Sequence, residues 1–220
     1  MIGKNVIVVA TRNRGKSKEI RSFLEAFPVE ILDLNDFGPI PEVTEDGETF
    51  EENAYKKAAF TAKVLGLPAL ADDSGLEVEA LGGAPGVHSA RYAGPGADDE
   101  SNNRKLLLNM REIRERSARF CCVLSLAVPT GPALTYTATC DGIILEEPRG
   151  SSGFGYDPLF YYPPMGKSFG EMTLEEKSRV SHRGKALTEL KNEFPQVLRW
   201  LDQRAEEEKT LRGLKDICAE

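Results

Sequence analysis

Two adjacent carboxylates, Asp72 and Asp73, follow the apolar run "LPALA" and are the first candidates for chemistry in this chain. The run predicts a short strand, so both acids are expected at a strand end. Mg²⁺ takes one or two protein carboxylates and leaves its other positions to water and substrate phosphates. A carboxylate beside such an ion can also deprotonate an attacking water. The pair therefore indicates a magnesium-dependent hydrolytic site, with a strand-ending Asx turn as the alternative.

A second acidic stretch, "EVTEDGE", lies just ahead of a predicted helix. The helix is expected from a Thr49 N-cap to about Val64, because Glu52 stands three residues after Thr49, as a capping box requires. The acids of the stretch, which could contribute to the same metal site, are Glu42, Glu45, Asp46 and Glu48. For Asp46 and Glu48 a solvated acidic loop is the favoured interpretation.

The stretch "ATRNRGKS" joins an apolar run, Val6 to Ala10, to a helix predicted over Gly15 to Phe27. A strand, a polar turn and a helix N-terminus together present backbone N–H groups and a positive dipole end to an anion. The loop residues that would bind a phosphate are Thr11, Arg12, Asn13, Arg14, Gly15 and Lys16. A Walker A loop would need a glycine in place of Ala10, so the match to that motif is weak. A solvated surface turn is the other interpretation.

Two later stretches could bind the rest of a nucleotide. "SSGFGYDP" carries Phe154, Tyr156 and Asp157, and its aromatic rings could stack on a planar base or close the loop onto the core. "EEKSRVSHRGKAL" gathers donors and positive charge at a helix start, which suits an anion or a keto oxygen. Its candidates are Lys177, Ser178, Ser181, His182, Arg183 and Lys185. His88 and His182, the two histidines, are too few for a zinc site without further ligands.

Predicted helices and strands surround these stretches. "SNNRKLLLNM" predicts a helix, and "RFCCVLSLAV" predicts a central strand covered on both faces. "LTYTATC" and "GIILEE" predict further strands, with Asp141-Gly142 as a hairpin turn or a strand kink. A helix is expected from about Ser181, interrupted by Pro195. The charge-dense segment at about 202–220 predicts a solvated helical extension.

The length of 220 residues favours one α/β domain, or two lobes that share a cleft. The formal net charge of −7 argues against a general nucleic-acid binder, so any anion site must be local. The first apolar run is too short for a signal sequence or a membrane span, and a cytoplasmic protein without membrane contact is expected. The four cysteines, which form no C-x-x-C pair and are expected to be reduced packing residues, are Cys121, Cys122, Cys140 and Cys218.

In this order, the stretches resemble the family of non-canonical purine nucleoside triphosphate pyrophosphatases, the inosine triphosphatase-like enzymes. "ATRNRGK" is similar to the phosphate loop of the family, "EDGETFEENAYKKA" to its acidic loop and helix, and "LADDSGLEVEALGGAPGVHSARY" to its longest motif. "GFGYDP" is similar to its base-binding loop and "EEKSRVSHRGKAL" to its closing motif. The resemblance covers almost the whole chain. It implies an elongated mixed β-sheet with flanking helices, two lobes around a nucleotide-binding cleft, and a homodimer.

The resemblance also implies a role for individual residues. Asp73 would be the general base and would hold Mg²⁺ together with Glu45, while Asp72 would support it from the adjacent position. Lys57 and Lys177 would join the phosphate loop in binding the triphosphate. The implied nucleoside contacts are Ser74, Phe154, Gly155, Tyr156, Asp157, His182 and Arg183.

The implied reaction is attack of water at the α-phosphorus of ITP, dITP or XTP, which releases pyrophosphate and a nucleoside monophosphate. Donors from His182 and Arg183 would favour a 6-keto oxygen over the 6-amino group of adenine. Two alternatives stay open at this point: a nucleotide-binding or sensor module without turnover and, with less support, a P-loop NTPase.

Overall fold

The structure, a computed structural model, describes residues 5–41 and 43–217, with side chains described for 6–41 and 43–210. Glu42 and Cys218 lie outside the described residues. A mixed seven-stranded sheet in the order β2-β1-β3-β4-β5-β6-β7 forms the framework. Its strands are β1 (Asn5–Val9), β2 (Val29–Asp33), β3 (Ala69–Val78), β4 (Ser117–Ala127), β5 (Ala133–Ile144), β6 (Phe160–Tyr162) and β7 (Lys167–Ser168). This is the expected α/β fold with flanking helices.

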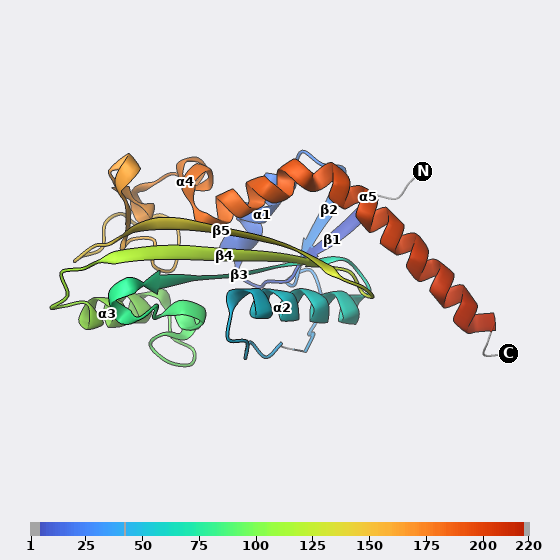
Figure 1. Cartoon of the computed structure of the whole chain (residues 1–220), viewed down its shortest axis with the longest axis horizontal. Coiled ribbons are helices and arrows are strands. Elements are labelled where there is room, and N and C mark those ends of the chain that lie inside the picture. The colour runs from blue at the N-terminus through green and yellow to red at the C-terminus, as the bar shows by residue number, and fades with distance from the viewer. Residues whose placement is uncertain (1–4, 42, 218–220) are drawn as a thin grey trace.

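The direction of strand pairing in the sheet changes at β3. Strand β1 pairs in parallel with β2 and with β3, whereas the steps from β3 through β7 are antiparallel. Strands β3, β4 and β5 are the long elements that give the molecule its elongated shape (Figure 1). The β3 and β4 strands are mostly buried, as expected for strands covered on both faces.

Helices cover both faces of the sheet (Figure 1). The helices are α1 (Arg14–Leu24), α2 (Phe50–Leu65), α3 (Asp99–Asn109), α4 (Leu174–Val180) and α5 (His182–Ile217). Helices α1 and α5 pack on one face, with Ile20, Leu24, Leu187 and Leu190 in the same core cluster as Leu70. Helix α2 lies on the opposite face, where Ala58 and Ala62 pack on small side chains of β1 and β3. A third cluster joins α3 to the far end of the sheet.

The predicted helix starts are confirmed with one difference in detail. Thr49 caps α2 by accepting from the backbone N–H of Glu52. The Glu52 carboxylate, however, accepts from the N–H of Glu48 rather than from that of Thr49. The reciprocal half of the capping box is therefore shifted by one residue. Gly66 then ends the helix in the left-handed conformation.

The structure corrects two expectations about strands. Asp72 and Asp73 lie in the middle of β3, not at its end, because the strand continues to Val78. Of the two interpretations of Asp141-Gly142, the hairpin turn is wrong, because both segments belong to one strand, β5. A Cβ on Gly142 would lie 2.6 Å from the carbonyl oxygen of Tyr161, so this glycine permits close strand approach rather than a turn.

Pro195 does not interrupt α5, which continues as one element to Ile217. The proline is exposed while its neighbours Phe194 and Val197 are buried. Water can therefore reach the backbone carbonyl that loses its helical partner, and the cost of an interior proline is reduced. The helix bends and its last turns project beyond the sheet (Figure 1).

Candidate functional site

Two cavities lie next to each other along β3. The smaller, of about 130 Å³, is lined from β3, α3, the 153–157 loop and the start of α5. The larger, of about 380 Å³, is lined by the phosphate loop, the 40–45 segment, α2 and β3. Asn13, Lys16, Ser74 and Ala90 line both. The two cavities are therefore compartments of a single cleft, and they meet at these four residues.

The phosphate loop is shaped by its own side chains. Asn13 is the N-cap of α1 and accepts from the N–H of Lys16, while the Thr11 hydroxyl accepts from the N–H of Asn13. Arg12 donates to the carbonyl of Leu34 beyond β2. These contacts fix the conformation of the loop, which together with the first turn of α1 lines the larger cavity.

The structure separates two of the predicted loop residues from the cleft. Arg14 lines a different surface hollow behind α1 together with Lys18 and Arg21, so it is not placed with the other candidates. Gly15 lines neither cavity, but a Cβ on it would lie 2.9 Å from the ring of Phe154. Gly15 thus gives space to an aromatic side chain that reaches across from the 153–157 loop.

Asp72 and Asp73 point to opposite faces of the sheet, as neighbours on a strand must. Asp72 forms ion pairs with Lys16 of α1 and Arg183 of α5, and the Arg183 Nε to Asp72 Oδ2 distance is 2.9 Å. Asp73 instead meets α2, with its Oδ1 at 2.5 Å from Lys57 Nζ. Each acid is therefore matched by a cation from the helix that covers its own face. Asp72 nevertheless lines the larger cavity together with Asp73, and its predicted supporting role stays a prediction.

The two acids also differ in their pKa. Burial raises the pKa of Asp73, and the Lys57 ammonium lowers it only in part, so the net shift is upward. Burial acts in the same direction on Asp72, but the charges of Arg183 and Lys16 outweigh it and hold the pKa of that carboxyl well below its usual range. A carboxylate with a raised pKa is the better proton acceptor. Asp73 is accordingly the stronger candidate for a general base.

Glu45 and Asp73 converge on one cation. Lys57 Nζ lies 3.4 Å from Glu45 Oε2 and 2.5 Å from Asp73 Oδ1, and all three side chains line the larger cavity. Across the described residues, no cluster of three or more His, Cys, Asp and Glu side chains is arranged to hold a metal. Two carboxylates in a cavity with room for phosphates nevertheless fit Mg²⁺, which takes its remaining ligands from water and substrate.

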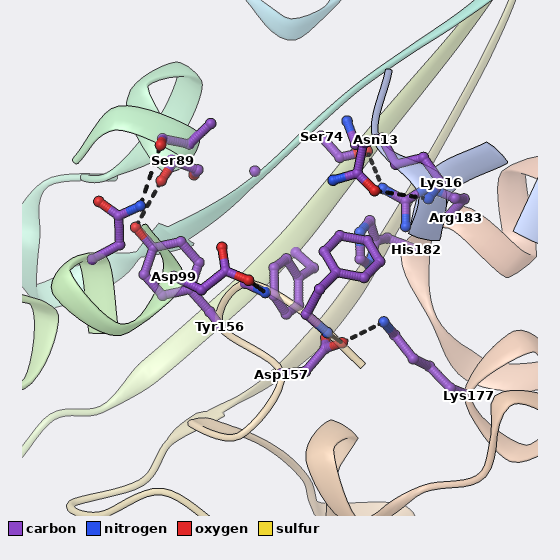
Figure 2. Close-up of a pocket in the computed structure, with 16 residues that line it drawn as sticks. Asn13, Lys16, Ser74, Ser89, Asp99, Tyr156, Asp157, Lys177, His182 and Arg183 are labelled. Carbon is purple, nitrogen blue, oxygen red and sulfur yellow. Dashed lines mark hydrogen bonds and ion pairs between the residues drawn. The ribbon is translucent and has the colours of Figure 1, made fainter. Parts of the chain in front are cut away.

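The smaller cavity combines aromatic side chains with charged and polar ones (Figure 2). Lys177 points to Asp157, with its Nζ at 2.6 Å from Asp157 Oδ2. The His182 ring stacks on Phe120 at a centroid distance of 4.6 Å, and its Nδ1 has no hydrogen-bond partner. Burial, assisted by the charges of Arg183 and Lys177, holds the pKa of His182 well below its usual range. The imidazole is therefore neutral at pH 7, and its buried Nδ1 is left without a hydrogen-bond partner within the described residues.

The two aromatic residues of the 153–157 loop have different positions. Tyr156 is buried, and its hydroxyl donates to the carbonyl of Ser89, which is the anchoring role considered as the alternative to stacking. Phe154 is half-buried, with Lys177 Nζ at 4.8 Å and Arg183 Cζ at 5.5 Å from its ring centroid. Of the two rings, Phe154 is the better placed to meet a base.

Sequence reasoning missed several side chains that build the cleft. Glu19 of α1 binds both Arg183 and Lys177, at 2.7 Å and 3.6 Å. Asp99 and Asn103 of α3 bind the backbone N–H and carbonyl of Gly155. No spacing rule could have found these contacts, because they join elements more than 50 residues apart, although Glu19 stands out in its sequence as the one acid in the basic run 12–21.

Comparison with known proteins places the chain among characterised folds. A model of the Ham1 family matches residues 7–193. A dITP/XTP pyrophosphatase of Syntrophobacter fumaroxidans is 68% identical over 97% of this chain and 92% of that protein. One from Desulfotalea psychrophila is 61% identical over 93% of this chain and 92% of its own length. The solved structure of a HAM1 protein from Coxiella burnetii is 40% identical, with a TM-score of 0.81 over 87% of this chain and 99% of that one.

Proposed function

Because the chain belongs to the Ham1 family, we propose that its cleft hydrolyses ITP, dITP and XTP to the nucleoside monophosphate and pyrophosphate. The relatives named dITP/XTP pyrophosphatase reach 68% identity across nearly the whole chain, which supports turnover rather than sensing. Such an enzyme removes non-standard purine nucleotides from the pool. The P-loop NTPase alternative loses its support, since the family match and the mixed sheet belong to another fold.

The observation that carries this proposal is the position of Asp73 in the cleft. A nucleotide with its base in the smaller cavity would run past Asn13, Lys16 and Ser74, and its phosphates would enter the larger one. Asp73 lines that larger cavity, with a raised pKa and Lys57 beside it. A nucleotide bound in this way would present its phosphates to a general base.

The side chains of the larger cavity account for hydrolysis. Asp73 would take a proton from water as the water attacks the α-phosphorus and the bond to the β-phosphate oxygen breaks. Lys16 and Lys57 would stabilise the negative charge that develops on the phosphates and on the leaving pyrophosphate. We propose that Glu45 and Asp73 hold Mg²⁺, which when bound neutralises phosphate charge and polarises the phosphoryl oxygens.

The smaller cavity accounts for the choice of base. Neutral His182 and the buried Arg183 present a hydrogen-bonding edge, so a 6-keto oxygen would find donors there. The 6-amino group of adenine is itself a donor and would face the donors of His182 and Arg183. Buried polar groups would then be left unpaired, which discriminates strongly against adenine nucleotides. Phe154 would supply a sequence-tolerant stacking surface.

Two wider features belong to the same proposal. We expect a homodimer in the cytoplasm, where free nucleotides are met. Within the described part of the chain no helix combines the length and hydrophobicity that a membrane span requires.

The test is to incubate the purified protein with Mg²⁺ and, in separate reactions, ITP, XTP, dITP, GTP and ATP, and to identify the products by ion-exchange chromatography. The proposal expects monophosphate plus pyrophosphate from ITP, dITP and XTP, with ATP and GTP nearly untouched. Nucleoside diphosphate plus orthophosphate would contradict the proposed cleavage between the α- and β-phosphates. Tight binding of ITP without turnover would instead support the sensor module.

A further inference from the structure

The side chain of Lys57 forms ion pairs with both carboxylates that are proposed to hold Mg²⁺. It extends from α2 into the larger cavity, is 13% exposed, and its Nζ lies within 3.4 Å of Glu45 and 2.5 Å of Asp73. A lysine ammonium is charged at pH 7, and this one forms ion pairs with both carboxylates. A divalent cation that enters this place must therefore compete with a cation of the protein itself.

We propose that Lys57 holds the place of the metal in the nucleotide-free enzyme and exchanges with it when the substrate arrives. This inference rests on the proposed function, since it assumes the Glu45 and Asp73 site for Mg²⁺. In the free enzyme the Lys57 ammonium lies between the buried carboxylate of Asp73 and the exposed carboxylate of Glu45, which would otherwise repel each other. In the complex the metal takes over that compensation, and the long flexible side chain turns to the phosphates.

The exchange follows from a charge balance inside the cavity. Without nucleotide, adding Mg²⁺ beside Lys57 would place an ammonium and a dication around two carboxylates, which leaves uncompensated positive charge. A nucleoside triphosphate brings about four negative charges, which can bind both the displaced lysine and the metal. Metal and nucleotide should therefore bind synergistically, and metal alone should bind weakly.

The neighbouring lysine provides a matched control. Lys56 belongs to the same helix and also forms an ion pair with an acid of the 45–48 stretch, Asp46, at 2.8 Å. Both side chains of this ion pair are exposed, and Lys56 lines neither cavity. Its replacement changes the net charge of the protein equally but leaves Glu45 and Asp73 with Lys57.

A second control separates occupancy from charge. Lys16 pairs with Asp72 on the other face of β3, yet its charge acts on Asp73 through space. Lys16→Met therefore removes a nearby positive charge without removing a side chain that touches both carboxylates. A metal affinity that responds to Lys57 and not to Lys16 would identify the lysine that holds the metal's place.

The experiment measures binding of Mg²⁺ by isothermal titration calorimetry, and of Mn²⁺ by electron paramagnetic resonance, to wild type and to Lys57→Met, Lys56→Met and Lys16→Met. Each protein is titrated alone and with a non-hydrolysable α,β-methylene analogue of ITP. We expect Lys57→Met alone to bind metal about tenfold more tightly than wild type, because a larger fraction of the protein is competent to bind it. Lys56→Met should match wild type, and Lys16→Met should change far less than Lys57→Met.

The outcomes separate this inference from the proposed function. If wild type binds metal with the analogue but Lys57→Met gains no affinity, the exchange is overturned while the magnesium site stands. An equal gain in Lys16→Met would also overturn it, since charge alone would then suffice. If no protein binds metal with the analogue present, the magnesium site and the exchange both fall.

Discussion

At the residue scale, the pair Asp72 and Asp73 shows how one step along a strand separates two functions. Asp72 is 3% exposed between two cations of α1 and α5, and Asp73 is 7% exposed beside one cation of α2. The fold therefore stabilises the ionised form of Asp72 and destabilises that of Asp73, as the opposite directions of their pKa shifts state.

This contrast predicts opposite phenotypes for Asp72→Asn and Asp73→Asn. The lowered pKa of Asp72 contributes stability that is present above the unfolded value of 3.8 and lost as the pH falls through the folded value. Asp72→Asn should lower the free energy of unfolding at pH 7 by about 3 to 5 kcal/mol, because it leaves buried cations unpaired.

Asp73→Asn should cost little stability, since the raised pKa of Asp73 means that its contribution is lost as the pH rises through the folded value. Its kcat should fall by about 10²- to 10⁴-fold through loss of a general base, with nucleotide affinity retained. Urea unfolding and steady-state kinetics on both variants measure this. Equal losses of stability in the two variants would contradict the assignment of the acids to separate faces.

A buried neutral histidine makes stability depend on pH. The pKa of His182 is held well below 6.5, so the unfolded chain binds a proton before the folded chain does. Stability should therefore fall as the pH drops below about 6.5, by up to about 1.4 kcal/mol per pH unit from this residue. His182→Gln should remove that component, seen by urea unfolding between pH 5 and 8. A constant difference between wild type and variant across this range would show that His182 titrates normally.

At the element scale, α3 holds the 153–157 loop, which we propose binds the base. Asp99 accepts from the N–H of Gly155 at 2.6 Å, and the amide of Asn103 donates to the carbonyl of Gly155 at 2.9 Å. Gly155 has a φ of +63°, a conformation that suits glycine, and the two side chains fix both of its backbone groups. Phe154 and Asp157 on either side are thus positioned by a helix that sequence reasoning did not connect with the base.

Asn103→Ala should loosen this loop. Loss of one partly buried hydrogen bond of about 1 to 1.5 kcal/mol predicts a KM for ITP raised about 5- to 10-fold, with a smaller change in kcat. Asn109→Ala is the control, because Asn109 lies on the same helix and bonds the Tyr92 hydroxyl instead of the loop. Steady-state kinetics on both variants provide the measurement. If the control raised KM equally, the effect would belong to α3 as a whole.

Elements with strong periodicity could be predicted from the sequence, and their ends less well. Helices α1, α2 and α3 and the buried strand β4 follow from hydrophobic spacing and caps. The continuation of β3 beyond Asp73 could not be predicted from the sequence. Two adjacent acids are tolerated inside a buried strand here because Lys57 of α2 and Arg183 of α5 form ion pairs with them, and these contacts exist only in the folded chain. The straight course of β5 through Gly142 likewise depends on a neighbour in space, Phe160.

The same limit applies to the site. The loop at 11–16 and Asp73 could be proposed from the sequence because their chemistry is local in sequence. Glu19, Asp99 and Asn103 were missed because their contacts form only when distant elements pack. Arg14 was included because it stands within the motif, yet the helical turn carries it to the opposite side of α1.

At the scale of the whole molecule, α5 contributes to the site at one end and leaves it at the other. Its first residues, His182 and Arg183, are buried in the cleft, and its middle packs on β4 and β5 through Leu190, Phe194 and Leu201. Beyond this, residues 203–210 are mostly exposed and carry surface ion pairs such as Lys209 with Glu206. Pairs of this kind contribute little to stability.

Removal of residues 203–220 should therefore leave kcat and KM for ITP unchanged. The cleft lies at the other end of α5, and among the side chains described up to residue 210 the last one of that helix in the core is Leu201. Kinetics and the oligomeric state from sedimentation velocity check this together. A large loss of activity, or dissociation of an otherwise dimeric enzyme, would give the extension a role that the exposed residues 203–210 do not predict.

The proposed reaction requires that water attack the α-phosphorus of ITP, and oxygen isotopes report directly which phosphorus is attacked. ITP is hydrolysed with Mg²⁺ in H₂¹⁸O, and both products are analysed by mass spectrometry. A cleft that presents the α-phosphorus to a water activated by Asp73 predicts one ¹⁸O atom in inosine monophosphate and none in pyrophosphate. Label in pyrophosphate or orthophosphate would place the attack at another phosphorus and contradict the central claim.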